Sequence, residues 1–131
     1  MGCDIHAHIE LKVNGKWEHY NCPTIQRWYR LFERICGVRG DVELAIDKPR
    51  GIPADLNIVT ELDYKRWEGD SHSATWLTKE ELNELIEWAE NLDPLWQHKQ
   101  LGYLNGSNFL QYPESHPKEF EDVRFICWFD N

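Results

Sequence analysis

Residues 2–12 read GCDIHAHIELK, and this stretch decides the fold. Apolar and ionisable side chains alternate along it: Ile5, Ala7, Ile9 and Leu11 form one set, and Asp4, His6, His8 and Glu10 form the other. A period of two indicates a half-buried β-strand. Asn14-Gly15 follows, and this pair favours a two-residue hairpin turn, which needs positive φ at both central positions. We therefore expect the chain to open with a β-hairpin whose return strand is Lys16–Tyr20.

Two helices are predicted by clear apolar stripes. Residues 27–36 read RWYRLFERIC, and Gly37 follows as a helix stop. The apolar face of this helix consists of Trp28, Leu31, Phe32 and Ile35. A second helix opens at Thr78, because Thr78-Lys79-Glu80-Glu81 is a capping box that Leu77 and Leu82 can staple. The buried stripe of the second helix is Leu82, Leu85, Ile86 and Ala89.

The remaining segments complete the fold prediction. A weaker helix is expected at 58–67, with Leu62 and Trp67 inward, and a short one at 93–100. Residues 37–57 and 102–120 read as loops, because Gly and Pro recur in them. Val123–Asp130 is apolar on both faces apart from Arg124, which favours a central strand. We therefore expect a single α+β domain over 1–131, in which a small mixed or antiparallel sheet (N-terminal hairpin plus C-terminal strand) packs with two to four helices and long loops.

Charge narrows the range of partners. The chain carries 23 acidic and 14 basic residues, for a formal net charge of −9. Such a chain repels long polyanions, so wrapping of DNA or RNA is disfavoured. A small anionic ligand in a local arginine pocket stays compatible with this charge, and Arg39 and Arg50 are candidates to line one. The alternative is that these arginines are solubilising surface charges.

The absence of targeting segments and the spacing of the cysteines both favour a cytoplasmic protein with free thiols. The chain has no run of about 18 apolar residues and no signal-peptide pattern, so we expect no membrane span and a cytoplasmic protein. None of the four cysteines, Cys3, Cys22, Cys36 and Cys127, belongs to a CxxC pair. We therefore expect free, mostly buried thiols rather than a four-cysteine zinc site.

Two Asp-x-His elements are the candidate chemical groups. Asp4 and His6 share the polar face of the first strand, where neighbours lie about 6.5–7 Å apart at Cα. Asp70 and His72 repeat the spacing in Gly69–Ser73, which reads as a loop. Taken singly, the first element can be a solvated sheet face and the second an ordinary turn. Taken together, they predict one site, to which a paired C-terminal strand would bring Asp130 and Asn131 close.

The chemistry of that site stays open between two mechanisms. Imidazoles and carboxylates are ligands for zinc, manganese or nickel, so one divalent metal is a candidate cofactor. Two histidines can instead divide the proton transfers of phosphodiester cleavage without a metal. The chain has no GxSxG, GxxxxGK[ST] or GxGxxG motif to indicate another catalytic template.

The sequence resembles a group of uncharacterised phage and prophage-encoded proteins that open with MGCDIH. The resemblance is carried, in order, by MGCDIHAHIE, NGKW, RWYRLFERICGVRG, PRGIPADL, GDSHSATWLTKEEL and VRFICWFDN, over nearly the whole chain. These blocks contain Asp4, His6, Arg39, Arg50, Asp70, His72, Ser73, Trp76, Arg124, Asp130 and Asn131. Members of the group commonly carry an apolar or aromatic residue where this chain has His8. The resemblance therefore favours Asp4 and His6 with Asp70 and His72 as metal ligands or catalytic residues.

The resemblance also suggests a role in countering host immunity that signals through nucleotides. We expect a small phosphodiesterase acting on a nucleotide-type signal in the host cytoplasm. His6 and His72 would be ligands or the acid–base pair, and Asp4 and Asp70 ligands or histidine orienters. Arg39, Arg50, Ser73 and Trp76 would contact the substrate. The alternatives are a non-enzymatic protein that sequesters a small anionic nucleotide, and an inhibitor whose acidic surface mimics a polyanion; a homo-oligomer is compatible with each.

Overall fold

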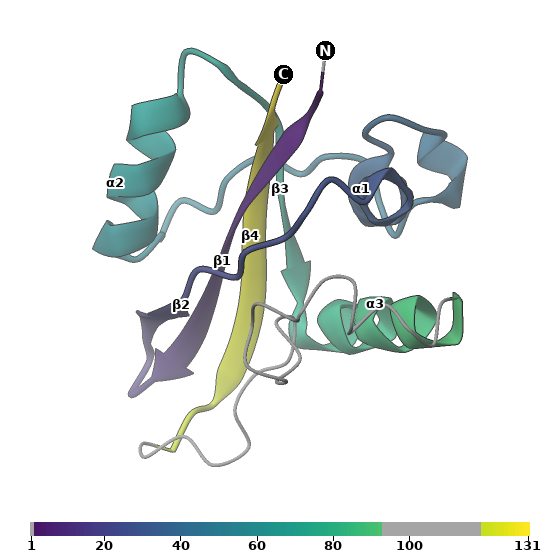
Figure 1. Cartoon of the computed structure of the whole chain (residues 1–131). Helices are drawn as coiled ribbons and strands as arrows, with labels where there is room; N and C mark the ends of the chain where they lie inside the picture. The colour runs from purple at the N-terminus through teal and green to yellow at the C-terminus, as the bar shows by residue number, and fades with distance from the viewer. Residues whose placement is uncertain (1, 93–118) are drawn as a thin grey trace.

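A computed structural model describes residues 2–92 and 119–131 (Figure 1). Its four-stranded sheet has the order β2-β1-β4-β3, with neighbouring strands antiparallel. The strands are β1 (Asp4–Val13), β2 (Lys16–Asn21), β3 (Ser71–Thr78) and β4 (Asp122–Asp130). The helices are α1 (Tyr29–Cys36), α2 (Ile58–Trp67) and α3 (Lys79–Leu92), with a 3-10 turn at Val42–Leu44. The α+β prediction is confirmed; the helix expected at 93–100 and most of the 102–120 loop lie outside the described residues.

The predicted hairpin is confirmed, and it carries a β-bulge. Asn14 and Gly15 have φ of 50° and 76°, as the tight turn requires. Pairing runs from Val13 opposite Lys16 to Glu10 opposite His19, and then shifts so that Ile9 lies opposite Asn21. The shift makes Tyr20 an extra residue in β2. A bulge of this kind bends its strand and re-aims the side chains that follow it.

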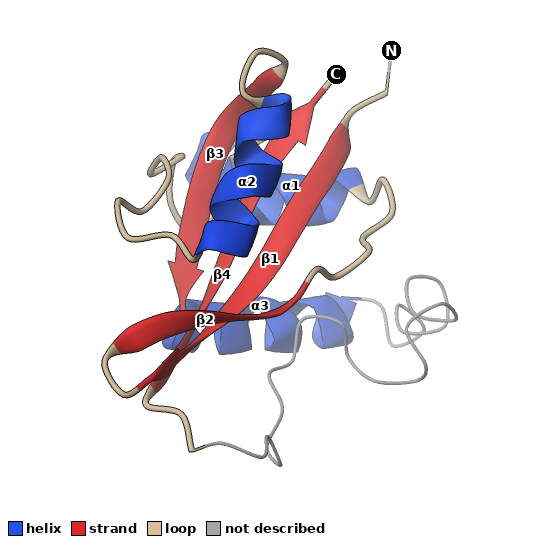
Figure 2. Ribbon diagram, turned by 90° about the vertical axis from the view of Figure 1, so that its left-hand side faces the viewer, coloured by secondary structure: helices blue, strands red, loops and turns tan. Residues whose placement is uncertain are grey.

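One face of the sheet holds the hydrophobic core under α1 and α3 (Figure 2). The core includes the apolar side chains of β1, namely Ile5, Ala7, Ile9, Leu11 and Val13. The predicted apolar stripes of α1 and α3 are also buried in it, except that Trp28 is only partly buried. The predicted helix signals are confirmed. Gly37 has φ of 85° and donates its N–H to the Glu33 carbonyl. Thr78 and Glu81 exchange the two hydrogen bonds of the capping box, at 3.0 and 3.2 Å.

The other face lies under α2, which polar contacts hold in place. Arg124 on β4, the predicted central strand, donates to Glu10 on β1 from Nε and Nη2, at 2.9 and 2.6 Å. The other carboxylate oxygen of Glu10 accepts hydrogen bonds from Thr60 Oγ1 of α2 and from the backbone N–H of Asn57, the residue that caps this helix. Glu10 is fully buried, so these bonds replace the water that its carboxylate loses.

The orientation predicted for α2 is wrong in part. Leu62 is 58% exposed, and it shares the outer side of the helix with Ile58 and Val59. The helix turns Thr60 inward instead, because the buried Glu10 carboxylate is a stronger determinant here than a single apolar residue. None of the described helices combines the length and the apolar composition that a membrane crossing requires.

The loop predicted at Gly69–Ser73 is wrong from Ser71 onward, where β3 begins. Ser71 pairs with Asp130 and His72 with Phe129, and the register then shifts before Thr75. Ser73 lies in this irregular stretch with φ of 55°. Gly and Asp gave a correct turn signal at 69–70, but pairing with the apolar β4 decides the conformation of the residues that follow.

Candidate metal centre

Four ionisable side chains on the α2 face of β1 have charged partners. The pairs are Asp4 with Arg27, His6 with Asp130, His8 with Asp63 and Glu10 with Arg124, at 2.5–2.7 Å between the closest polar atoms. His8 and Glu10 are 1% and 0% exposed, so the alternative of a solvated sheet face is excluded for them. His8 and Glu10 thus form the buried part of a polar layer between the sheet and α2.

Within this layer, three metal-binding atoms converge. Nδ1 of His8 lies 2.9 Å from Nε2 of His19, and Sγ of Cys22 lies 3.2 Å from the first nitrogen and 3.5 Å from the second. A tetrahedral zinc site with Zn–N of about 2.0–2.1 Å and Zn–S of about 2.3 Å places its ligand atoms about 3.3–3.6 Å apart. The observed triangle is smaller by a few tenths of an ångström. The cluster of His8, His19 and Cys22 can therefore hold a metal ion.

Asp63 fixes which nitrogen of His8 faces the cluster. Its Oδ2 lies 2.7 Å from Nε2 of His8. Because a carboxylate only accepts, Nε2 carries the hydrogen and Nδ1 presents a lone pair to His19 and Cys22. A histidine that binds a metal through one nitrogen while the other donates to a carboxylate is a recurrent arrangement in metal sites.

The protonation states suit imidazole ligands. Burial lowers the pKa of His8 from its ordinary value, and it also lowers the pKa of His19, with His8 adding to that effect. Both imidazoles are therefore neutral at pH 7, as metal ligation requires. Burial raises the pKa of the Cys22 thiol, with the Asp63 charge adding to it. Cys22 thus keeps its proton until a cation displaces it.

Local structure explains how distant residues meet here. The shifted register after the bulge, continued by one residue, places Cys22 opposite His8. His19 pairs with Glu10, so it belongs to the same face of the sheet. Asp63 follows Thr60 by three residues on α2, and the Thr60–Glu10 hydrogen bond turns that side of the helix to the sheet.

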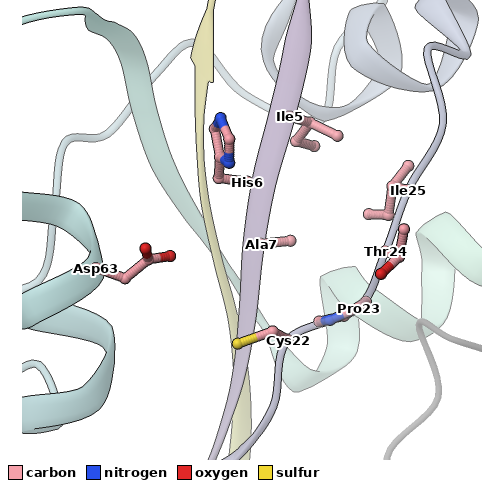
Figure 3. A pocket seen from close by; sticks show the side chains of 8 residues that line it. All are labelled: Ile5, His6, Ala7, Cys22, Pro23, Thr24, Ile25 and Asp63. Carbon is pink, nitrogen blue, oxygen red and sulfur yellow. The ribbon is translucent and has the colours of Figure 1, made fainter. Parts of the chain in front are cut away.

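A pocket of about 240 Å³ adjoins the cluster at the edge of β1 that β2 leaves uncovered. Its lining consists of Ile5, His6, Ala7, Cys22, Pro23, Thr24, Ile25 and Asp63. Figure 3 shows His6 and Asp63 on one side of β1 and Ile5, Thr24 and Ile25 on the other. The pocket is therefore bordered by Cys22, a member of the cluster, and by Asp63, the hydrogen-bond partner of His8.

The histidines of the two Asp-x-His elements do not meet in one cavity. His6 pairs with Trp128 and His72 with Phe129, and successive residues of β4 face opposite sides of the sheet. His6 therefore lies under α2, whereas His72 stacks on Phe129 of the core, with ring centroids 6.2 Å apart. His72 belongs to β3, so strand pairing with β4 fixes the face of the sheet on which its side chain lies. In the predicted loop at Gly69–Ser73, no strand pairing would have fixed that orientation.

Asp130 and Asn131 each contact one of these histidines. Oδ2 of Asp130 lies 2.5 Å from Nε2 of His6, and Oδ1 of Asn131 lies 3.1 Å from Nε2 of His72. Pairing of β4 with β1 and β3 thus brings Asp130 close to His6 and Asn131 close to His72, but not to one shared site.

Two other predicted metal ligands, Asp4 and Asp70, and the predicted substrate-binding residue Ser73 lie apart from the metal cluster. Asp4 forms a largely exposed ion pair with Arg27, and Asp70 is exposed in the turn after α2. Ser73 contacts Nδ1 of His72 through its hydroxyl, at 3.0 Å. All three are thus outside the pocket lining, and their assigned roles stay predictions.

The predicted phosphate-binding arginines also lie elsewhere. Arg39 stacks over the ring of Tyr29, 5.2 Å from its centroid. Arg50 forms a double hydrogen bond with Glu81 at 2.5–2.6 Å and covers the ring of Trp76. Arg50 therefore links Trp76 of β3 to Glu81 in the first turn of α3.

Sequence reasoning missed three of the four residues at the centre. The family resemblance disfavours His8, and no motif in the sequence points to His19, Cys22 or Asp63. The hairpin register predicts the position of His19, because counting outward from a two-residue turn at Asn14-Gly15 places His19 opposite Glu10. Comparisons with protein-family models, with curated proteins and with solved structures gave no match, so the site stands on its geometry.

Proposed function

We propose that this protein is a small zinc-dependent hydrolase whose metal is held by His8, His19 and Cys22. The observation that carries the proposal is a three-atom ligand set next to a pocket. Structural zinc sites almost always have four protein ligands, whereas catalytic sites have three and leave the fourth position to water or substrate. Two of the ligands, His19 and Cys22, are half-buried and exposed, so the open side of the set faces outward.

The donor set favours zinc among the metals expected from the sequence. Thiolate with imidazole suits zinc, manganese prefers oxygen ligands, and nickel favours square-planar geometry. A zinc ion at this position would lower the pKa of a bound water to about 7 and supply hydroxide near neutral pH. Asp63 supports the role by holding His8 in the ligating tautomer.

The proposed substrate is a small phosphodiester of the nucleotide type. This part rests on the resemblance of the sequence to phage proteins, and the pocket size is compatible with one ester group rather than a polymer. Arg27 follows Ile25 of the lining by two residues and pairs with Asp4, so it is a candidate guanidinium for an incoming phosphate.

The test measures metal content and turnover in the same samples. Protein purified without chelator is analysed for zinc, copper, nickel and manganese, and is then incubated with bis(p-nitrophenyl) phosphate and a panel of cyclic nucleotides. We expect one zinc per chain and new products on chromatography. His19→Ala and Cys22→Ser should lose both, since these side chains are not part of the core and their removal spares the fold.

Asp70→Asn is the matched control, because Asp70 is an exposed carboxylate outside the cluster. It should keep zinc and turnover. A chain that takes up no zinc at micromolar concentration contradicts the metal centre. Zinc-loaded protein that returns every substrate intact contradicts the hydrolase; intact nucleotide recovered by heating such protein would identify the sequestering alternative.

A further inference from the structure

Among the described residues that line the pocket, His6 is the one histidine, and it does not belong to the metal cluster. Its ring stacks on Trp67 of α2, with centroids 4.1 Å apart and planes inclined by 29°. On the sheet side it lies 6.2 Å from the ring of Trp128, also near parallel. Aromatic rings on both sides restrict the imidazole to one orientation.

Asp130 fixes the tautomer of this imidazole. Its Oδ2 is 2.5 Å from Nε2 of His6, and the two side chains are only 18% and 22% exposed. The carboxylate accepts, so Nε2 carries the hydrogen and the lone pair is on Nδ1. Nδ1 makes no hydrogen bond to any residue in 2–92 or 119–131. The charged groups around His6 are Asp130 on β4, Asp4 with its partner Arg27, and Asp63 on α2.

We infer that His6 is the proton-transfer residue of the pocket, acting at Nδ1, and that Asp130 is its positioning residue. The inference rests on the proposed hydrolase function. His6 and Cys22, one of the proposed zinc ligands, both line the pocket, so the imidazole and the proposed metal centre border the same space. A carboxylate that holds a histidine in one tautomer is the arrangement that other hydrolases use for this purpose.

The step balances without an added reagent. The attacking water gives a proton to Nδ1 of His6 while its oxygen forms a bond to the phosphorus of the ester. The bond between phosphorus and the leaving oxygen breaks, and that oxygen keeps the electron pair. Nδ1 then returns the proton to the leaving oxygen, so His6 ends as it began. Asp130 stays ionised throughout and stabilises the charged imidazole.

His72 does not serve this role in the structure. It stacks on Phe129 on the core face, and both of its nitrogens are engaged, with Ser73 and with Asn131. It does not line the pocket. His72→Gln is therefore the matched control, since it removes an imidazole at the same end of the sheet without touching the zinc ligands.

The experiment compares His6→Ala, Asp130→Asn and His72→Gln, each loaded with zinc and checked for one zinc per chain. We expect His6→Ala to lose turnover at least about 100-fold at unchanged zinc content, with partial recovery in added imidazole. His72→Gln should keep turnover. Full turnover of His6→Ala overturns the inference while the zinc-dependent hydrolase stands.

Nitrogen NMR of the imidazoles tests the positioning role without relying on turnover. In the wild-type protein we expect His6 to carry its hydrogen on Nε2, and in Asp130→Asn a mixture of tautomers. A wild-type His6 with its hydrogen on Nδ1 overturns the inference. Absence of zinc or of turnover from wild-type protein contradicts the proposed function instead, so the two failures are distinguishable.

Discussion

Oδ2 of Asp63 on α2 accepts a hydrogen bond of 2.7 Å from Nε2 of His8 on β1. His8 is buried and lies flat against Trp128, with ring centroids 5.3 Å apart, so the bond leaves its Nδ1 facing His19 and Cys22. Asp63 itself donates no atom to the ligand triangle. Its contribution to metal binding is therefore orientation, and it can be removed without removing a ligand.

Asp63→Asn should reduce zinc affinity by about 10–100-fold, the usual effect of losing a partner of a metal-binding histidine. The amide keeps the size of the side chain but holds the imidazole tautomer less firmly. Competition with a chromophoric chelator measures the change. Glu61→Gln is the control and should bind zinc as the wild type does, because Glu61 is two residues before Asp63, on another side of α2, where it pairs with Lys65. Equal affinity for Asp63→Asn and wild type would remove Asp63 from the site.

Much of the fold was predictable because its signals are local. The Asn14-Gly15 turn, the Gly37 helix stop and the Thr78–Glu81 capping box are each specified within four residues, and each is confirmed. β3 was missed because Ser71–Thr78 lacks strict alternation. Its strand character comes from pairing with β4, which is about fifty residues away in sequence and buried on both faces.

The site was less predictable than the fold, for a related reason. The polar face of β1 was recognised, but its partners depend on long-range geometry. Cys22 reaches His8 only because Tyr20 is bulged, and Asp63 reaches it only because Thr60 bonds to Glu10. A bulge and a helix orientation are tertiary outcomes that no spacing rule in the sequence specifies. The two Asp-x-His elements matched in spacing, yet strand register sends their histidines to opposite faces.

Zinc binding should release a proton at pH 7. The two imidazoles are already neutral, because burial lowers the pKa of both His8 and His19. The pKa of Cys22 is raised by burial, so its thiol is protonated before zinc binds and a thiolate afterwards. We expect about one proton per zinc. Titration calorimetry in buffers of different ionisation enthalpy measures it, and release of none would show that Cys22 is not a ligand.

The apo protein should lose stability on mild acidification. The pKa of His8 is lower in the folded protein than the usual 6.5, chiefly through burial. The neutral form is therefore favoured by folding, so the stabilising contribution is complete above pH 6.5 and is lost as the pH falls through the folded value. Urea unfolding between pH 7.5 and 5 should show this loss, and bound zinc should reduce it. His72→Gln is the control and should keep the slope; an unchanged stability over this range contradicts the buried neutral imidazole.

Glu81 should give a separate loss at lower pH. Its hydrogen bonds with Arg50, more than any other contact, lower its pKa from 4.5 to about 2. Since the folded value is the lower one, the contribution is present above pH 4.5 and is lost as the pH falls toward about 2. It amounts to at most about 3 kcal/mol. The difference in unfolding free energy between wild type and Glu81→Gln, measured from pH 6 to 3, should shrink as the pH falls; Glu80→Gln, exposed in the same turn, should show no such trend.

The buried pair of Glu10 and Arg124 should control both stability and metal affinity. Arg124→Met leaves the Glu10 carboxylate buried without its charged partner, and we expect it to destabilise the fold by about 3–5 kcal/mol. Lys65→Met, which breaks an exposed pair with Glu61, should change stability by less than about 0.5 kcal/mol. Glu10 also holds Thr60, and Thr60 lies one turn before Asp63, so loss of the pair should loosen α2 over the metal cluster. Zinc affinity of Arg124→Met should therefore fall at a temperature where the variant is still folded by circular dichroism. If the variant is destabilised as expected but binds zinc with wild-type affinity, the orientation of Asp63 does not depend on this pair.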